Sequence, residues 1–326
     1  MISDYLGSFG DLPVTDFLHC VENDPAALPA ADAVAWRIAI DYDTERPFAE
    51  VWRQFLDTVA PEEVRALVIG AWWDDEYVPI QPVLDLLVAA APRLPALRAL
   101  FLADVTAEEC EVSWLQMSDV TPVLEAFPEL TEFVARGCGY NEPGENLALR
   151  PVRHERLRTL RLESGGLPGE VVRAVSASDL PALEYLELWL GVDQYGGDAT
   201  VADLAPVLAG ARLPALRRLG LMNSEIQDEI AAAVAAAPVV ARLDVLDLSM
   251  GILTDTGAEA LLAGQPLTHL SRLDLRHHYL SDAMMARLRE ALEPAGVEVE
   301  LSGQEKPHTW EFRGEVRESR YVAVSE

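Results

Sequence analysis

Residues 180–188 read LPALEYLEL, and this arrangement of four apolar positions returns along the chain. Residues 94–102 read LPALRALFL, residues 213–221 read LPALRRLGL and residues 267–275 read LTHLSRLDL. A fixed period of this kind is typical of a stacked solenoid, in which each repeat contacts only its neighbours. The third apolar residue of each copy, looser copies included, is Leu67, Leu100, Phe133, Leu160, Leu186, Leu219, Leu246, Leu273 and Val299, at steps of 26 to 33 residues.

Each repeat combines two local patterns. Alternating apolar and polar residues around the third position predict a strand, and later residues at helical spacing, such as Leu204, Val207 and Leu208, predict a helix. A strand, a helix and a parallel strand form a right-handed crossover. We therefore expect an α/β fold: a right-handed solenoid, or horseshoe, of about ten rungs with parallel strands on the concave face and helices on the convex face.

The repeat also sets the expected domain boundaries. The first strand is predicted at residues 34–40, and the solenoid at residues 33–302. Residues 1–32 lack the repeat, so we expect them to cap the open end of the first rung, as solenoids require. Residues 303–326 are expected to form a C-terminal tail that packs on the last rung, because they are too apolar for a disordered segment.

The composition restricts the partners. The chain of 326 residues carries 54 Asp and Glu against 25 Lys and Arg, a formal net charge of −29. Nucleic acids and anionic membranes require clustered Lys and Arg, so neither is expected as a partner, whereas a basic protein is attracted. Cys20, Cys110 and Cys138 are too few and too far apart for a disulfide framework, and the first residues lack a signal-peptide pattern. We therefore expect a cytoplasmic protein with reduced thiols.

Residues 253–275, LTDTGAEALLAGQPLTHLSRLDL, and residues 279–292, YLSDAMMARLREAL, resemble the leucine-rich repeat family in its long-repeat, ribonuclease-inhibitor-like subclass. In that family an Asn or Cys five residues past the third apolar position bonds the turn backbone, and Cys138 matches it. The chain also resembles a group of actinomycete-type bacterial leucine-rich-repeat proteins, whose companions are radical-SAM, ATP-grasp-like and hydrolase proteins. That likeness implies partners of those kinds. Departures from the Asn or Cys position are Gly165, Gly191, Ser224, Gly251 and His278.

Between the buried leucines of a strand, alternate side chains point to the concave face. One interpretation of their charges is a solvated face with cross-strand ion pairs, such as Arg136 with Glu163 and Arg161 with Glu187. The other is a surface that binds a partner. The candidate partner-binding residues are Arg136, Arg161, Glu163, Tyr185, Glu187, Trp189, Met222, Asp247, Arg272, Asp274 and Arg276.

Tyr185, Trp189 and Met222 favour the second interpretation. They are expected to project on the same face from adjacent rungs, and exposed aromatic residues near Arg are typical anchors of protein interfaces. A further candidate is the loop at Trp72 and Trp73, where two aromatic residues precede acidic ones. This loop either recognises a partner or simply packs its rings on its neighbours.

Asp247, Asp274 and Glu300 form a column of acids, because they occupy one repeat position on three successive rungs. Neighbouring strands lie about 4.8 Å apart, so these carboxylates need a cation nearby. Arg272 and Arg276 flank the column and can supply it. The alternative is a basic side chain of a partner or a divalent cation with oxygen ligands.

The search for catalytic motifs finds little. The six histidines lack metal-ligand spacing, and G-x-S-x-G, Walker A and dinucleotide glycine motifs are missing from the sequence. We therefore expect a non-enzymatic, monomeric scaffold that needs no cofactor and holds a protein or peptide in its concave face. Two alternatives stay open: an inhibitor-like binder of a basic enzyme, and a metal-dependent accessory factor of a modification gene set that acts through the acidic column.

Overall fold

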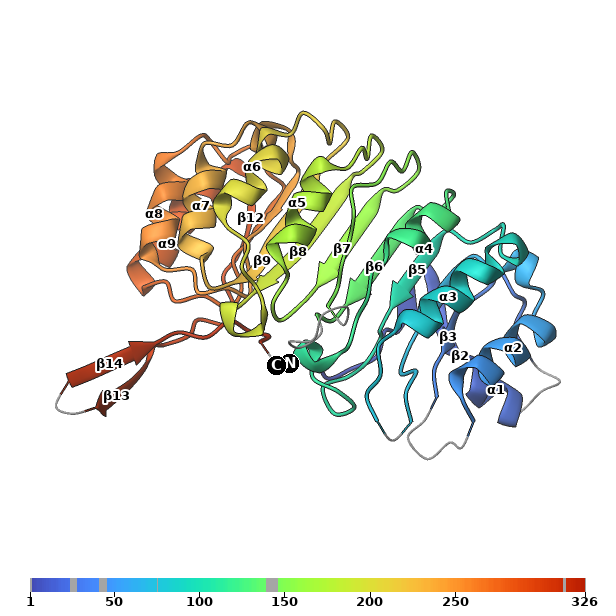
Figure 1. Ribbon diagram of the computed structural model, residues 1–326. Coiled ribbons are helices and arrows are strands. Elements are labelled where there is room, and N and C mark those ends of the chain that lie inside the picture. The colour runs from blue at the N-terminus through green and yellow to red at the C-terminus, as the bar shows by residue number, and fades with distance from the viewer. Residues whose placement is uncertain are drawn as a thin grey trace.

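The computed structural model describes residues 2–23, 28–40, 46–74, 76–138, 146–312 and 315–325. It contains a curved sheet of twelve strands, β1 to β12, in which neighbours in sequence are neighbours in space (Figure 1). β1 and β2 pair antiparallel, and each later pair of neighbours is parallel. The fold is the predicted α/β solenoid of the leucine-rich-repeat type. The strands are β1 Ser8–Phe9, β2 Leu12–Asp16, β3 Ala35–Ile38, β4 Ala66–Ile69, β5 Ala99–Leu102, β6 Glu132–Arg136, β7 Thr159–Glu163, β8 Tyr185–Gly191, β9 Arg218–Ser224, β10 Val245–Asp247, β11 Arg272–Asp274 and β12 Glu298–Glu300.

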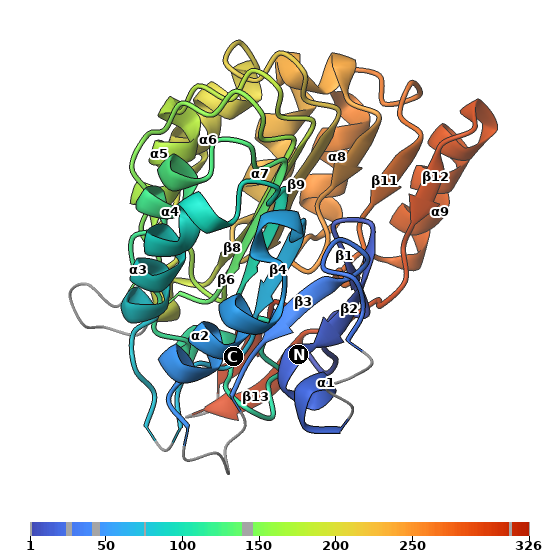
Figure 2. The same ribbon diagram turned by 90° about the vertical axis from the view of Figure 1, so that its right-hand side faces the viewer.

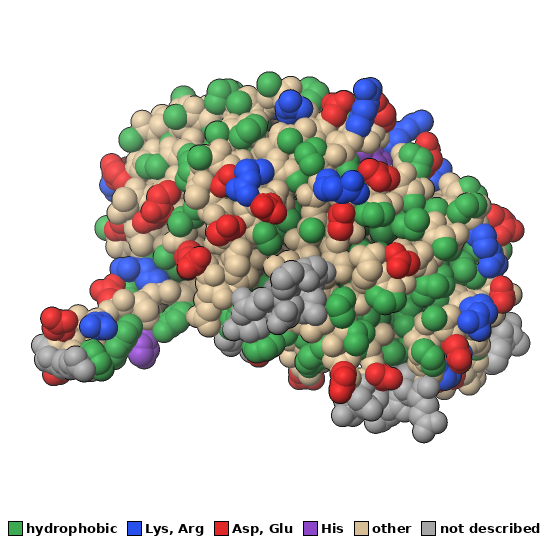
Figure 3. Space-filling view, viewed as in Figure 1, with side chains coloured by type: hydrophobic (Ala, Val, Ile, Leu, Met, Phe, Trp, Pro, Cys, Tyr) green, Lys and Arg blue, Asp and Glu red, His purple; other side chains and the backbone are tan. Residues whose placement is uncertain are grey.

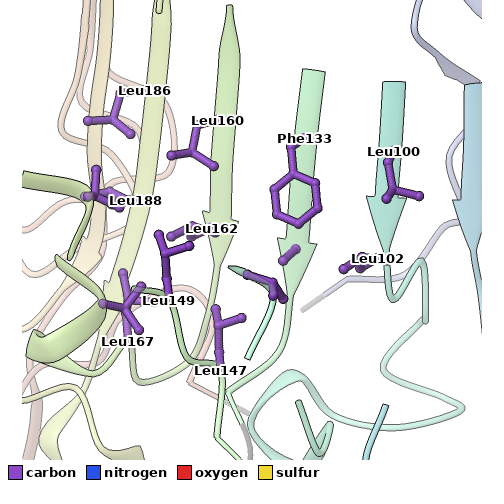
Figure 4. Close-up of a cluster of buried hydrophobic side chains, with 14 of the residues drawn as sticks. Leu100, Leu102, Phe133, Leu147, Leu149, Leu160, Leu162, Leu167, Leu186 and Leu188 are labelled. Atoms are coloured by element: carbon purple, nitrogen blue, oxygen red, sulfur yellow. The ribbon is translucent and has the colours of Figure 1, made fainter. Parts of the chain in front are cut away.

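The register of the sheet follows the leucine pattern. Leu186 pairs with Leu160 on one side and with Leu219 on the other, and the series continues to Leu273 and Val299. The side chains of Leu160 and Leu186 lie in the interior with Leu147, Leu149 and Leu167 of the connecting segments (Figure 4). Each fully buried leucine contributes about 1.5–3 kcal/mol, so the repeated pattern supplies a continuous core along the array.

The helices cover the convex face of the sheet (Figure 1). Their apolar faces point inward, as in α2, where Val51, Trp52 and Phe55 are buried. Ser281 caps α9 by accepting a hydrogen bond from the backbone of Met284. The helices are α1 Phe17–Asn23, α2 Phe48–Thr58, α3 Gln81–Ala90, α4 Thr121–Ala126, α5 Gly169–Ala177, α6 Val201–Ala209, α7 Gln227–Ala235, α8 Asp255–Ala263 and α9 Asp282–Leu292.

The N-terminal segment differs from the prediction, because the solenoid begins inside residues 1–32. β2 pairs parallel with β3, with Val14 opposite Ala35, and α1 connects the two strands. The LPVTD sequence of β2 alternates apolar and polar residues, so it can extend the sheet, and β1 pairs with its free edge. The segment also covers the concave face. Phe9 packs edge-on against the ring of Phe101, with the ring centres 5.7 Å apart.

The C-terminal tail also differs from the prediction that it packs on the last rung. β13 (His308–Phe312) and β14 (Glu315–Ser319) form an antiparallel hairpin that projects away from the solenoid (Figure 1). Its apolar side chains Trp310, Phe312 and Val316 are exposed. Residues 321–325 then return to the solenoid, where Val324 joins an apolar cluster beside β8 and β9. The tail therefore buries its last valines against middle rungs and leaves the hairpin in solvent.

Candidate partner-binding face

Ion pairs form a continuous row across the concave side of the first half of the array. Arg37 Nη1 lies 3.1 Å from Asp16 Oδ2, and Arg37 Nε lies 3.3 Å from Asp104 Oδ2. Asp104 Oδ1 lies 3.7 Å from Arg136 Nη1. Arg136 Nε continues the row at 2.8 Å from Glu163 Oε2. These contacts connect β2, β3, the segment after β5, β6 and β7.

The row continues into β8. Glu163 pairs with Arg161, and Arg161 Nε lies 3.3 Å from Glu187 Oε1. The predicted pairs Arg136–Glu163 and Arg161–Glu187 are therefore confirmed. We call the whole row the charge ladder, and its members are Asp16, Arg37, Asp104, Arg136, Glu163, Arg161 and Glu187.

Most of the charge ladder is buried, with Asp104 and Glu163 fully enclosed. Burial raises the pKa of Asp104, and the guanidinium groups of Arg37 and Arg136 oppose that rise. Taking charges out of water is costly, so such a row holds only while each carboxylate keeps its arginine. The charge ladder therefore acts mainly as part of the protein core and offers little surface to a partner.

Sequence reasoning missed three members of the charge ladder. Asp16 lies in the segment without the repeat, and Asp104 lies beyond the end of its strand. Arg37 occupies an alternating position in the predicted strand at residues 34–40, so the pattern offered a signal for it. The N-terminus completes the site, because the ring of Tyr5 stacks 4.1 Å from the Arg37 guanidinium and Leu6 N donates to Asp104.

Tyr185 lies at the end of the charge ladder and is half-buried. Its hydroxyl donates to Glu187, and the guanidinium of Arg218 stacks over its ring at 4.5 Å. Burial raises the pKa of Tyr185, and Glu187 raises it further, so the phenol stays protonated. Arg218 is exposed, which places a cation–π pair at the solvent boundary of the concave face.

Trp189 and Met222 do not form the exposed patch that the sequence predicts. They are only 8% and 5% exposed, because Val112 and Val324 pack against them. The indole nitrogen of Trp189 donates to Glu187 Oε1 at 2.8 Å. The cover comes from a distant loop and from the C-terminus, so strand periodicity alone could not reveal it.

The loop at Trp72 and Trp73 follows the second of its two interpretations. Both rings are buried, and they contact each other edge-on with centres 4.8 Å apart. The nitrogen of Trp72 donates to the carbonyl of Val78, and Tyr77 packs against Trp73. The two tryptophans therefore stabilise their own loop and offer little surface to a partner.

The acidic column has the predicted register, since Asp247 pairs with Asp274 and Asp274 with Glu300. Arg272 Nη2 and Arg276 Nε lie 2.9 and 3.0 Å from Asp274, so arginines neutralise the central acid. Among the described residues, no group of three or more His, Cys, Asp or Glu side chains is arranged to hold a metal ion. The arginine interpretation of the column is the one that the geometry favours.

Asp247 differs from its neighbours in the column. It is half-buried, and its carboxylate accepts a hydrogen bond from the backbone of Ser249. Burial raises the pKa of Asp247 to about 6, and the nearby charges of Asp274 and Glu187 add to the rise. This carboxyl group therefore titrates closer to neutrality than an ordinary aspartate.

The buried histidine and cysteine side chains of the core make structural contacts. The buried ring of His154 links Phe127 O to Leu157 N, and burial lowers the pKa of His154. Cys138 lies buried at its repeat position with its sulfur 3.4 Å from Ser113 O, and burial raises the pKa of this thiol. Cys110 is also buried, which raises its pKa to about 12. A neutral thiol is a poor nucleophile, so neither cysteine is activated.

The second half of the concave face remains accessible. Beside buried side chains such as Glu187 and Asp274, it presents half-buried and exposed ones from β7 to β12 and from the residues just after β11. The convex side, in contrast, shows acidic and basic side chains interspersed with apolar ones (Figure 3). We call the accessible area the open concave surface, and its residues are Arg161, Tyr185, Arg218, Asp247, Arg272, Arg276, Glu298 and Glu300.

Of the comparisons with known proteins, one with a solved structure supports the fold. Scans against protein-family models and against curated proteins gave no match. Among solved structures, the chain is similar to a crystal structure of a Bacteroides fragilis protein, with a TM-score of 0.74 and 29% identity over 83% of this chain and 74% of that chain. It is also similar to the TLR13 chain of a TLR13–ssRNA13 complex, with a TM-score of 0.41 and 13% identity over 86% of this chain and 34% of that chain. The chain thus spans about a third of the TLR13 chain.

Two further observations concern the surroundings of the protein. Over the described residues, the helices are all too short or too polar to cross a bilayer. Cys20, Cys110 and Cys138 carry free thiols.

Proposed function

We propose that the protein is a non-enzymatic scaffold that binds a protein partner on the open concave surface. The observation that carries this proposal is the stacked pair of Tyr185 and Arg218 on that surface. Tyrosine and arginine are among the residues that most often dominate binding energy at protein interfaces. Both side chains have large surfaces that a partner can bury.

The surface is held in advance of binding. Tyr185 is fixed through Glu187, which Arg161 and Trp189 also hold. Side chains that are already ordered lose little conformational entropy when a partner binds, so more of the contact energy remains as affinity. Parallel strands also give these side chains a rigid base.

The charge of the molecule favours a basic partner. A formal net charge of −29 attracts cationic proteins over several ångströms and speeds their encounter. At the edge of the open concave surface, Glu298 is exposed and Glu300 half-buried, so both can meet basic side chains. Free thiols fit a reducing compartment such as the cytoplasm.

The test is a comparison of baits in an affinity purification from the native cell. The wild-type chain, an Arg218→Ala/Tyr185→Phe variant and a control variant on the convex side are compared by quantitative mass spectrometry. Arg287→Ala is a suitable control, because Arg287 pairs with Glu259 between two outer helices. We expect one protein to be captured by the wild type and the control and to be depleted about tenfold with the double variant.

Binding of that protein is then measured directly by calorimetry at low and high salt. We expect the affinity for a basic partner to fall as salt screens the attraction. Equal binding by the wild type and the Arg218→Ala/Tyr185→Phe variant, with unchanged melting temperatures, would rule out this surface as the binding site.

A further inference from the structure

The last described residues, 321–325, lie across the exits of three successive strands. At these exits the residue four places past the third apolar residue of the repeat has a positive backbone φ. The angle is 55° at Asn223, 68° at Met250 and 55° at His277. Such backbone is strained for residues other than glycine, with asparagine the best tolerated. The exits of β9, β10 and β11 therefore have the same unusual turn, and the three turns form a row.

Two of the three turns bind the backbone of the tail directly. His277 Nε2 lies 2.9 Å from Tyr321 O at the exit of β11. Beside this turn, the hydroxyl of Tyr279 also donates to Tyr321 O and accepts from Tyr321 N. At the exit of β10, Ala323 N donates to Met250 O at 2.8 Å. Successive parts of the tail are thus bound by successive rungs.

The third turn, at the exit of β9, binds the tail through a reciprocal pair of hydrogen bonds. Asn223 Nδ2 donates to Val324 O at 2.5 Å, and Val324 N donates to Asn223 Oδ1 at 3.0 Å. The side-chain amide of Asn223 therefore pairs with both backbone groups of one tail residue. Together the three turns hold the tail one rung at a time, through its backbone.

Side chains add shape to this backbone recognition. Val324 is 5% exposed and packs among Val112, Trp189 and Met222. Val322 is also buried, and Ala323 packs partly against the same cluster as Val324. We call this place the tail site; it consists of Val112, Ser113, Trp189, Met222, Asn223, Met250 and His277.

The tail reaches the tail site by an indirect route. It leaves the last rung, passes through the projecting hairpin β13–β14 and only then returns (Figure 1). A hairpin of two strands is marginally stable by itself, so it adds little that would hold the tail in place. A pocket lined in part by Tyr195, Glu225 and Ile252 also remains open beside Val322. The contacts of the tail site itself therefore keep residues 321–325 bound.

We propose that the tail site is a peptide-recognition site, and that residues 321–325 are its built-in, releasable occupant. The partner that fits is a short segment of another protein with aliphatic side chains in the places of Val322 and Val324. Backbone hydrogen bonds supply affinity and the apolar contacts of the side chains supply specificity, as in other modes of peptide recognition. This surface is distinct from the Tyr185–Arg218 pair, and the two are linked through Glu187, to which Trp189 and Tyr185 both donate.

The experiment uses the full chain with the substitution Val324→Asp, which places a charge in the apolar pocket and releases the tail. The probe is a synthetic peptide of residues 320–326, RYVAVSE, followed by calorimetry or fluorescence anisotropy. We expect saturable binding to the Val324→Asp chain, at least about tenfold tighter than to the wild type, because a tethered tail competes at a high effective concentration. Adding Asn223→Ala to the Val324→Asp chain should abolish binding, and a peptide with Asp in place of its second valine should not bind.

Failure of the peptide to bind the folded Val324→Asp chain, or equal binding to both chains, would overturn the proposal. A second measurement covers the case in which that variant does not fold. In the wild type, hydrogen exchange at the amides of Ala323 and Val324 should be at least about a hundredfold faster than at Leu221 in β9, because release of the tail needs only local opening. Exchange as slow as that of Leu221 would show a permanently bound tail and would equally overturn the proposal.

Discussion

The two halves of the concave face have the same backbone geometry, but one half is covered by the chain itself and the other is accessible. From β3 to β6, small and apolar side chains such as Ala35, Val68 and Phe101 lie on the concave face, where the N-terminal segment covers them. From β7 to β12, the same positions carry charged residues, of which Arg161 and Asp247 remain partly accessible while Glu187 and Asp274 are buried. The curvature of a solenoid therefore does not by itself make a binding surface. The side chains between the leucines decide whether the hollow is filled from within the chain or left for a partner.

The boundary between the halves is the charge ladder. It starts beneath the N-terminal segment and ends at Tyr185, where the open concave surface begins. Most of its members are buried and behave as part of a core, whereas Asp16 and Arg161 are half-buried and contact solvent. Substitutions in the two halves should therefore have different consequences for stability.

The largest effect is expected for Arg136→Met, which removes a buried arginine of the charge ladder. Asp104 and Glu163 lose a partner, in a row that already holds four acids against three arginines. Breaking a buried ion pair typically costs about 3–5 kcal/mol, and we expect a loss of that size in urea unfolding.

The matched control for this prediction lies in the open half. Arg276 also pairs with an aspartate, Asp274, but its side chain is 50% exposed and Arg272 still holds that acid. Arg276→Ala should therefore cost less than about 1 kcal/mol. Similar losses for the two variants would show that the halves do not differ in this way.

A smaller effect is expected for Phe9→Ala, which opens the cover of the sealed half. Phe9 is buried against Phe101, and loss of a buried phenylalanine side chain costs about 3 kcal/mol. The comparison is Val245→Ala, at a half-buried position of β10, for which we expect less than about 1 kcal/mol. Thermal and urea unfolding of both variants measure the difference, and a tolerated Phe9→Ala change would mean that the N-terminal segment is only loosely attached.

The smallest effect concerns Asp247 and depends on pH. Burial raises the pKa of Asp247 from 3.8 to about 6, so between these values the folded protein keeps a proton that the unfolded chain releases. Its contribution to stability is full below pH 3.8 and is lost as the pH rises through about 6. Asp247→Asn should remove this part of the pH dependence and stabilise the protein at pH 7 by on the order of 1 kcal/mol, after allowance for solvent screening.

Glu300 in the same column provides a control of opposite sign. Hydrogen bonds from Ser302 lower the pKa of Glu300, so its contribution to stability is present at neutral pH and is lost in acid. Glu300→Gln should therefore not stabilise the protein at pH 7. Denaturant unfolding at pH 4, 5, 6 and 7 separates the two residues, and a stabilising effect of both substitutions would contradict the assignment.

The sequence predicted the parts of the structure that repeat. The leucines fix the strand register, and the register alone places Arg136 beside Glu163 and Arg161 beside Glu187. Asp247 and Asp274 follow by the same reasoning. These contacts are local in the solenoid, because they join neighbouring rungs at one position of the repeat.

The features that sequence reasoning missed come from segments outside the repeat. Trp189 and Met222 occupy the predicted positions, but Val324 covers them from more than a hundred residues away in sequence. The hairpin β13–β14 lies beyond the last repeat, where no neighbouring rung restricts its place. A periodic pattern describes contacts between rungs and contains no information on where non-repeating ends will lie.

Those ends meet. Ile2 packs against the same apolar cluster as Val324, and both views place the two termini close together (Figures 1 and 2). The chain is therefore nearly circular, and a short linker could join its termini while new ones are opened between β13 and β14. In such a circular permutant the order of the rungs would be kept. Residues 321–325 would be joined to the N-terminal side of the array and no longer to the last rung, so the tail would be tethered from the other side when it leaves its site.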